Sequence, residues 1–431
     1  MIECKNLTNG LRIATAGTYF TCCHTFNNPY KDENGKEMLA STHTIEDALK
    51  SPTRLKMLDD FKNDIRHPAC VVCWSGEDAG FISKRQRDND TFSQVLEVFP
   101  ERKGSDLFFL ELNLGNTCNL ACRICHISAS SKWKEFHHVT EIGISDEHLD
   151  EYVVKYSKAF KDESIVWDEL MKILPEVRSL DIYGGEPMLM KKQWEILEMS
   201  VKLGHSKKQQ MSFNTNGTII NEKYIEILSS FEQCRIGFSI DGVGERFNYL
   251  RHFGVWDVVK ENIKTWQNKV KETKNEKINF EVCCTISILN VLYVFEMVDF
   301  VIENQLKLMI AFVYNPLHLH IGSIPEEYKK IIINKLELEY EFRVNEVNNS
   351  LTLNDAEKFY RRSMLRQAEK VINTLKLPVE YRPIYWTEFR RQTIELDILR
   401  NQSFADTVPE VEEIYNITKI IKPNIEQKKL I

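Results

Sequence analysis

The stretch CNLACRIC, residues 118–125, places three cysteines at the spacing C-x3-C-x2-C within one short loop. It follows an apolar run at 107–114, LFFLELNL, which is typical of a buried strand. Thiolates are the preferred ligands of iron–sulfur clusters, and a [4Fe–4S] cluster usually takes four of them. Three thiolates on one loop can therefore hold three irons and leave the fourth iron open to a small molecule. A zinc site is the alternative, but its fourth ligand must come from a distance, because the adjacent His126 is poorly placed to turn back.

Strand and helix patterns alternate from this loop to about residue 320. Short apolar runs bounded by Gly, Asn or Asp lie at 107–114, 177–183, 210–214, 235–240, 278–286 and 308–314. Helical patterns lie between several of them, at Lys191–Leu203, Asn221–Phe231, Val255–Val270 and Leu292–Asn304. Such alternation indicates parallel βαβ units. Six strands predict an α/β fold with a partial (β/α)6 barrel, whose functional groups lie in loops after the carboxyl ends of the strands.

Two flanking regions differ from this barrel at 105–322. Residues 1–104 hold five of the eleven cysteines and two short strand patterns, Leu11–Ala14 and Thr18–Cys22, joined at Gly17. Residues 323–431 form a helical extension, with helices expected at Glu326–Val347, Asp355–Leu375, Trp386–Asn401 and Pro409–Ile421. We therefore predict three domains: 1–104, 105–322 and 323–431.

Composition excludes several classes of protein. The net charge of −7 gives no electrostatic case for duplex nucleic acid as a partner. We expect the basic cluster Lys84–Arg87 to be a solvated surface. No run of 18 apolar residues and no secretory start are present, so we expect a cytoplasmic protein without a membrane partner. Reduced cysteines in that compartment more often bind metal or carry out redox chemistry than form disulfides.

The cysteine loop after the first strand resembles the defining motif of the radical S-adenosylmethionine (SAM) superfamily. Further motifs end the next strands: Tyr183–Pro187 (YGGEP), Asn214–Gly217 (NTNG) and Ser239–Gly242 (SIDG). The resemblance implies that Cys118, Cys122 and Cys125 bind a [4Fe–4S] cluster whose open iron binds the methionine part of SAM. It also implies that an electron from the cluster cleaves SAM to a 5′-deoxyadenosyl radical, which abstracts a substrate hydrogen. A reductase such as flavodoxin or ferredoxin would supply that electron.

The same resemblance implies a set of residues around SAM. Two glycines permit a close approach of the backbone to a ligand, and Glu186 is expected to receive the SAM ammonium. Ser239 and Asp241 are expected at the ribose hydroxyls and Arg251 near the SAM carboxylate, although a surface position for this arginine stays open. The predicted cofactor-binding residues are Gly184, Gly185, Glu186, Pro187, Asn216, Ser239, Asp241 and Arg251. Ile124 departs from the family, which usually has an aromatic residue before the third cysteine.

A second cysteine set lies near the amino end. Cys70 and Cys73 form a C-x2-C-W pattern, and Cys4 and the Cys22-Cys23 pair precede it. The set resembles the Twitch/SPASM domains that carry an auxiliary [4Fe–4S] cluster, here placed before the barrel. The predicted ligands are Cys4, Cys22, Cys70 and Cys73, with Cys22 preferred because it follows Gly17 by five residues; a structural zinc site is the alternative.

The substrate is the least determined feature. A small or nucleotide-like molecule is favoured, because the amino end has no recognisable peptide-binding domain; a peptide or protein maturase is the alternative. A non-catalytic iron–sulfur or zinc scaffold, or a redox sensor, is the hypothesis from another class. The remaining cysteines, Cys234, Cys283 and Cys284, are expected as buried hydrophobic residues, and strand alternation directs either Cys283 or Cys284 into the barrel.

Overall fold

One eight-stranded sheet organises the chain in a computed structural model. This structure describes residues 2–78, 80, 82–98, 107–140, 144–161, 164–273, 275–378 and 382–417. All neighbouring strands are parallel except the outermost β2, which is antiparallel to β1. The strand order is β10 (Lys307–Phe312), β9 (Ile278–Ile286), β7 (Gln233–Ser239), β6 (Gln210–Thr215), β5 (Ser179–Tyr183), β3 (Phe109–Asn113), β1 (Gly10–Ile13) and β2 (Tyr19–Phe20).

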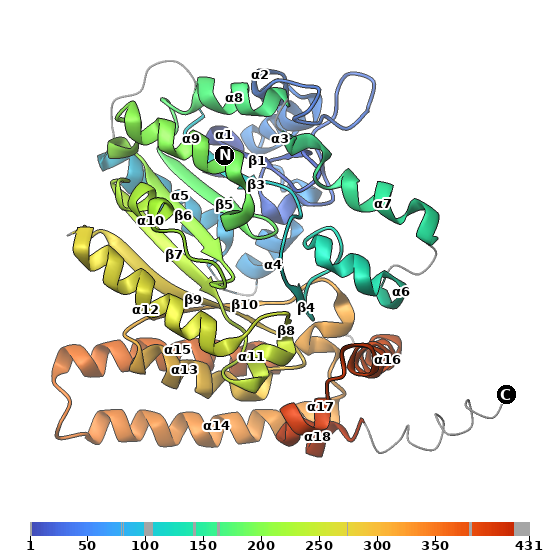
Figure 1. Cartoon of the computed structure of the whole chain (residues 1–431), viewed down its shortest axis with the longest axis vertical. Helices are drawn as coiled ribbons and strands as arrows, with labels where there is room; N and C mark the ends of the chain where they lie inside the picture. The colour runs from blue at the N-terminus through green and yellow to red at the C-terminus, as the bar shows by residue number, and fades with distance from the viewer. Residues whose placement is uncertain are drawn as a thin grey trace.

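Helices cover one face of this sheet, as a parallel sheet requires when its strands are joined by crossovers. Figure 1 shows them in front of the strands. They are α8 (Ile165–Ile173), α9 (Lys191–Lys202), α10 (Glu222–Ser229) and α12 (Trp256–Thr273), with α13 (Val294–Glu303) against β9 and the edge strand β10. Alternate strand residues such as Leu180 and Ile182 belong to the main hydrophobic core against these helices. The predicted α/β fold and all six predicted barrel strands are confirmed.

The amino-terminal region continues the barrel sheet. β1 pairs in parallel with β3, with Leu11 opposite Leu110, and the predicted hairpin forms around Gly17 at φ +83°. Five helices follow or flank this hairpin: α1 (Lys5–Asn9), α2 (Ile45–Leu49), α3 (Pro52–Lys62), α4 (Val71–Asp78) and α5 (Lys84–Val98). Figure 1 shows α5 behind the sheet, on the face away from α9 and α10. The expected domain boundary at residue 104 lies outside the described residues, so the division into domains stays a prediction.

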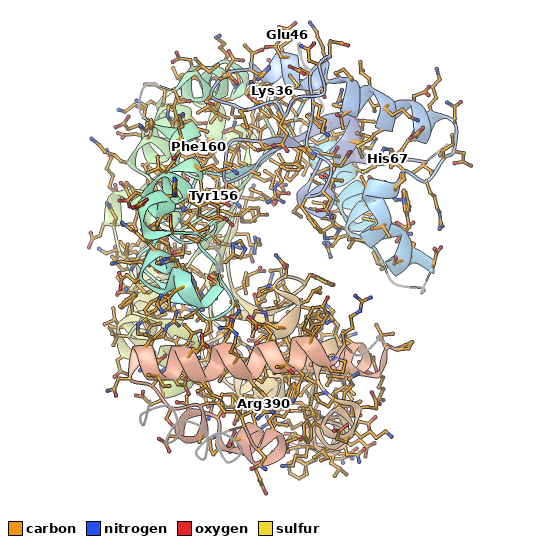
Figure 2. The ribbon with its side chains drawn as sticks, turned by 90° about the vertical axis from the view of Figure 1, so that its right-hand side faces the viewer. Lys36, Glu46, His67, Tyr156, Phe160 and Arg390 are labelled. Atoms are coloured by element: carbon orange, nitrogen blue, oxygen red, sulfur yellow. The ribbon has the colours of Figure 1, made fainter. Side chains whose placement is uncertain are left out.

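Helices also dominate the first crossover and the carboxyl-terminal part. The crossover contains α6 (His137–Thr140), α7 (Asp146–Lys155) and α8; α11 (Glu245–Leu250) precedes the short strand β8 (Arg251–His252). The carboxyl-terminal helices are α14 (Glu326–Asn349), α15 (Asp355–Lys376), α16 (Pro383–Arg400), α17 (Phe404–Thr407) and α18 (Pro409–Tyr415). The predicted end of the last helix, at residue 421, lies outside the described residues. In the side view, Glu46 of α2 lies at the top of the molecule and Arg390 of α16 lies in its lower part (Figure 2). Among the described helices, none combines the length and apolarity needed to cross a membrane.

Candidate functional site

A two-residue strand anchors the three-cysteine loop. β4 (Ala121–Cys122) pairs antiparallel with β8, which sets Cys122 opposite Arg251. The pairing is extended by Arg123, whose backbone N donates to Leu250 O at 2.7 Å. Trp133 Nε1 donates to Cys122 O at 3.0 Å from the other side. The loop is therefore held by both the strand after α11 and the first crossover.

Arg251 connects the cysteine loop to the end of the fourth barrel strand. It is buried, its Nη1 lies 3.8 Å from Cys122 Sγ, and its Nη2 lies 2.8 Å from Asp241 Oδ2. Asp241 Oδ1 also accepts from Thr285 N at 2.9 Å. The surface position left open for Arg251 is therefore wrong. Its guanidinium favours a thiolate at Cys122, and the pKa of Cys122 is lowered mainly by its hydrogen bond with Cys125 and further by Arg251.

The YGGEP turn presses against the cysteine loop. Gly184 and Gly185 have φ of +97° and +47°. A Cβ on Gly184 would lie 2.1 Å from Asn113 Oδ1, and one on Gly185 would lie 2.1 Å from Thr117 O. Glycine is required at both positions, because the backbone of the second strand end touches that of the first.

Glu186 joins the second and third strand ends. Its carboxylate is buried and accepts from Met188 N at 3.0 Å, Thr215 Oγ1 at 2.8 Å and Asn216 N at 2.7 Å. A carboxylate offers about four acceptor positions. Three of them are thus used within the protein, which gives Glu186 a positioning role and leaves about one position for the predicted SAM ammonium.

Asn119, between the first two cysteines, links the loop to the NTNG turn. Asn216 Nδ2 donates to Asn119 Oδ1 at 2.9 Å, and Asn119 Nδ2 donates to Thr218 Oγ1 at 2.8 Å. Sequence analysis overlooked Asn119 because the positions between the cysteines carry no defining pattern. Ser239 ends β7, the strand that pairs with β6 and its NTNG turn. The structure thus gathers the three cysteines and the predicted SAM-binding motifs at one end of the sheet, while contacts with SAM itself stay predictions.

Two arginines near the loop also escaped sequence analysis. Arg123 is buried over the ring of Tyr249, and its Nη2 donates to Asp397 Oδ1 of α16 at 2.5 Å. Arg400, also buried, lies over the rings of Trp133 and Phe136. Its Nε, Nη1 and Nη2 have no hydrogen-bond partner among the described residues. Neither arginine carries a local signal, because the contacts join segments more than 120 positions apart.

The surroundings of the three thiols fit an anionic, thiolate-bound group. Burial raises the pKa of Cys118 to about 11, so a bound metal must displace the proton. Arg251 approaches Cys122, and Arg400 brings a second, unpaired positive charge to its neighbourhood. A cluster ligated by three thiolates would receive the compensation that these buried cations offer.

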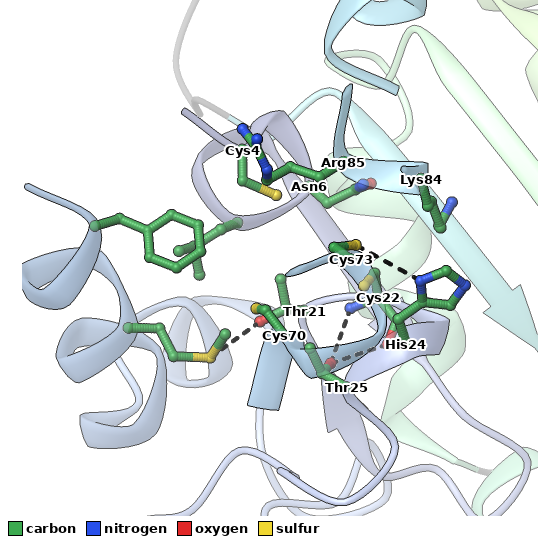
Figure 3. A pocket seen from close by; sticks show the side chains of 13 residues that line it. Cys4, Asn6, Thr21, Cys22, His24, Thr25, Cys70, Cys73, Lys84 and Arg85 are labelled. Carbon is green, nitrogen blue, oxygen red and sulfur yellow. Dashed lines mark hydrogen bonds between the residues drawn. The ribbon is translucent and has the colours of Figure 1, made fainter. Parts of the chain in front are cut away.

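The amino-terminal cysteines surround a single pocket. Cys4, Cys22, Cys70 and Cys73 all line it, together with His24, whose Nδ1 lies 3.7 Å from Cys73 Sγ (Figure 3). Cys23 is not among its lining residues. The four thiols come from the start of α1, the turn after β2, and the start of α4. This arrangement supports Cys22 over Cys23 as the predicted ligand.

Lys84 and Arg85 correct the expectation of a solvated basic surface at 84–87, whereas Arg87 of that cluster is 63% exposed as expected. Lys84 lines the same pocket and lies 2.6 Å from Asp88 Oδ2, and Arg85 pairs with Glu77 at 2.8 Å. Their side chains are 12% and 16% exposed, so both belong to the interior of the amino-terminal region. Packing against the cysteine pocket, which sequence spacing does not reveal, is the reason.

Neither cysteine set forms a ready single-ion site. Within the described part of the chain, no three His, Cys, Asp or Glu side chains converge closely enough to hold one metal ion.

The two adjacent cysteines of β9 point to opposite faces of the sheet. Cys284 belongs to the core facing the helices, whereas Cys283 Sγ lies 3.6 Å from Arg235 Nη1 on the other face.

Residues 112–279 match the family model described as "Radical SAM superfamily". This chain is also 23% identical over 342 residues to a protein of Methanococcus aeolicus named "Probable GTP 3′,8-cyclase". That alignment covers 74% of this chain and 95% of the relative. The matched family segment contains all three cysteines of 118–125 and every strand-end motif up to Arg251.

Solved structures of low overall similarity include "Native anSMEcpe with bound AdoMet" and SuiB of Streptococcus suis bound to S-adenosylmethionine. The first has a TM-score of 0.37 and 21% identity, covering 56% of this chain and 61% of that enzyme. The second has a TM-score of 0.33 and 12% identity, covering 78% and 68%. This chain thus spans less than two thirds of the first enzyme's length. On this match and the cysteine loop that it contains, residues 112–279 of the chain are similar to the radical SAM superfamily.

Proposed function

We propose that this chain cleaves SAM reductively and removes a hydrogen atom from a small, nucleotide-like substrate. The observation that carries the proposal is the convergence of the cysteine loop, the YGGEP turn and the NTNG turn at one end of the sheet, through Glu186 and Asn119. These contacts join the ends of three successive barrel strands, where parallel α/β enzymes bind their ligands.

The cofactors carry the hard chemistry, and the chain supplies ligands and orientation. Bound by Cys118, Cys122 and Cys125, a [4Fe–4S] cluster would supply the one electron that breaks the C5′–S bond of SAM, giving methionine and a 5′-deoxyadenosyl radical. Reduced flavodoxin or ferredoxin would provide that electron. Gly184 and Gly185 let the turn pack directly against the cysteine loop, and Arg251 holds positive charge beside the thiolates.

The substrate class rests on one relative and on the chemistry of the barrel. The name of the Methanococcus aeolicus relative refers to a nucleotide, which supports a nucleotide-like substrate for this chain. The barrel face opposite the helices carries charged and polar residues, including Arg235 and Glu281. Such a face suits a small polar molecule. A peptide substrate is the alternative, and stimulation of SAM cleavage by added nucleotides or peptides distinguishes the two.

A second cluster is proposed for the amino-terminal pocket, held by Cys4, Cys22, Cys70 and Cys73. Four thiols line one pocket, and burial raises the pKa of Cys4 to about 11 and that of Cys70 to about 12. Buried neutral thiols suit a metal cluster that displaces their protons. A cluster with four protein ligands there serves electron transfer or structure.

SAM cleavage tests the proposal directly. Anaerobically reconstituted, dithionite-reduced protein should convert SAM to 5′-deoxyadenosine, and replacement of Cys118, Cys122 and Cys125 together by alanine should abolish the product. Cys234→Ala, on a barrel strand outside both sets, is the matched control and should retain it. Continued production by the triple variant would refute the assignment, and bound zinc without cleavage by the wild type would favour a scaffold.

Iron content tests the second set, and substrate stimulation tests the substrate class. The wild type should bind about eight irons and the Cys70→Ala/Cys73→Ala variant about four, since each cubane contains four. Cys23→Ser should keep about eight irons.

Nucleoside triphosphates should raise the rate of 5′-deoxyadenosine formation, whereas stimulation by a peptide library alone would favour a maturase.

A further inference from the structure

A row of polar residues crosses the sheet face that the crossover helices leave free. Arg12, Glu111, Asp181, Ser212 and Arg235 occupy matching register positions on β1, β3, β5, β6 and β7. Their chain neighbours, such as Leu110 and Leu180, point into the core instead. Because strand side chains alternate, the five residues of this polar row share the opposite face.

The cations of the row already have partners. Arg12 Nη1 lies 3.1 Å from Glu111 Oε1. Arg235 donates to Ser212 Oγ at 2.8 Å and to Asn214 Oδ1 at 3.1 Å, and it pairs with Glu281. Lys84, which reaches toward the row from α5, pairs with Asp88. The positive charges are thus paired within the protein.

Two carboxylate groups at the centre of the row have acceptor positions left over. Glu111 is 1% exposed, and its Oε2 has no hydrogen-bond partner among the described residues. The neighbouring Asp181 accepts from Tyr183 Oη at 2.7 Å and makes no ion pair with another described residue. Buried acceptors without donors are costly unless a ligand supplies the donors.

The row lies between the two cysteine sets. Tyr183 is followed directly by Gly184 of the YGGEP turn, while Lys84 lines the amino-terminal cysteine pocket. The charges of Lys84, Glu111 and Arg235 all act on Asp181, so the groups form one electrostatic unit. Asp181 is only half-buried, which leaves it accessible to a small molecule.

We propose that Asp181 and the free oxygen of Glu111 bind an amino-bearing, hydrogen-bond-donating edge of the substrate. The subsite rests on the proposed function, since it lies in the same barrel. An exocyclic amino group has two N–H bonds that can be donated to two neighbouring carboxylates, and an amino-substituted nucleobase presents such a group at its edge. A substrate edge that presents only acceptors would face like partial charges and be rejected.

Matched nucleotides test this subsite without requiring turnover. The reconstituted, SAM-loaded wild type should bind GTP at least about ten-fold more tightly than inosine triphosphate, which lacks only the 2-amino group, or CTP more tightly than UTP by a similar factor. A lost hydrogen bond to a charged group is worth about this much. Equal affinities within both pairs would overturn the proposal.

The variants locate the preference. Asp181→Asn keeps the size of the side chain and should reduce the preferred pair's affinity ratio to about one. Tyr183→Phe removes only the donor to Asp181 and serves if the first variant does not fold. Asp168→Asn, exposed on α8, should keep the affinity ratio of the wild type.

An unchanged affinity ratio in both Asp181→Asn and Tyr183→Phe would refute the assignment to Asp181. A wild type that binds no SAM would refute the proposed function, whereas one that binds SAM without preferring amino-bearing nucleotides would refute only the subsite.

Discussion

Arg123 in the cysteine loop and Asp397 on α16 form a buried ion pair, 2.5 Å apart, across 274 positions of the chain. Their side chains are 2% and 14% exposed. Asp397 Oδ1 also accepts from Tyr249 Oη at 2.9 Å, and Oδ2 accepts from Phe404 N at 2.6 Å. The carboxyl-terminal extension therefore buttresses the loop that holds the predicted cluster.

Asp397→Ala should lower the free energy of unfolding by about 3–5 kcal/mol, because it leaves the Arg123 guanidinium buried without its carboxylate. Chemical denaturation measures the loss. Glu395→Ala breaks a half-exposed pair with Arg391 on the same helix and should cost less than about 1 kcal/mol. Similar small losses in both variants would show that the extension does not support the loop.

Gly185→Ala should abolish SAM binding or unfold the site, because the new Cβ meets the backbone oxygen of Thr117 at 2.1 Å. A backbone atom cannot move aside as a flexible side chain can. Gly35→Ala is the matched control: it has φ +76° but no atom within 4 Å of the added Cβ, so only the backbone penalty of about 1–2 kcal/mol applies. Equilibrium dialysis with SAM and thermal unfolding together separate the clash from the backbone penalty. Normal SAM affinity in Gly185→Ala would contradict the close contact.

Asp181 should make stability depend on pH. Burial raises the pKa of Asp181 from 3.8 to about 6, with Lys84 and Arg235 opposing and Glu111 adding to the rise. The folded protein then binds this proton more tightly than the unfolded chain. The stability from protonated Asp181 is present below about pH 4 and is lost as pH rises through about 6. Relative to the wild type, Asp181→Asn should gain up to about 3 kcal/mol over this range, as a shift of about two units implies. Denaturation at pH 5 and pH 7.5 checks the direction, and a constant difference between the two proteins would contradict it.

Arg400→Met should lower the reduction potential of the cluster proposed at Cys118, Cys122 and Cys125. Arg400 brings a buried positive charge without a hydrogen-bond partner among the described residues to the neighbourhood of Cys122, and a positive charge favours the reduced, more negative form. Methionine keeps an apolar contact with Trp133 and Phe136. An anaerobic redox titration followed by electron paramagnetic resonance gives the potential, with Arg391→Met on the same helix as the control. An unchanged potential would show that Arg400 acts only through packing.

Much of the architecture could be predicted because it depends on local patterns. Apolar runs bounded by turn residues identified all six barrel strands. The glycines of YGGEP predicted a close approach of the backbone to a ligand, and the structure shows both with positive φ and in close contact with the end of the first strand. The cysteine spacing indicated a cluster-binding loop before any fold was known. These signals lie within a few residues of one another, where backbone geometry alone relates side chains.

The tertiary structure decided the relationships between distant segments. β1 pairs with β3 and so extends the barrel sheet. Lys84, expected at the surface, lines the amino-terminal cysteine pocket, and Arg123 forms an ion pair with Asp397. Asp181 appears in the sequence as one more polar residue in a strand. Only the strand register and the ion pairs show that it makes no ion pair with another described residue, whereas Glu111 pairs with Arg12 and Arg235 with Glu281. Spacing along the chain shows which ligands one loop can supply. Burial and charge pairing depend instead on which strands and helices contact one another, and these contacts form only when the whole chain packs.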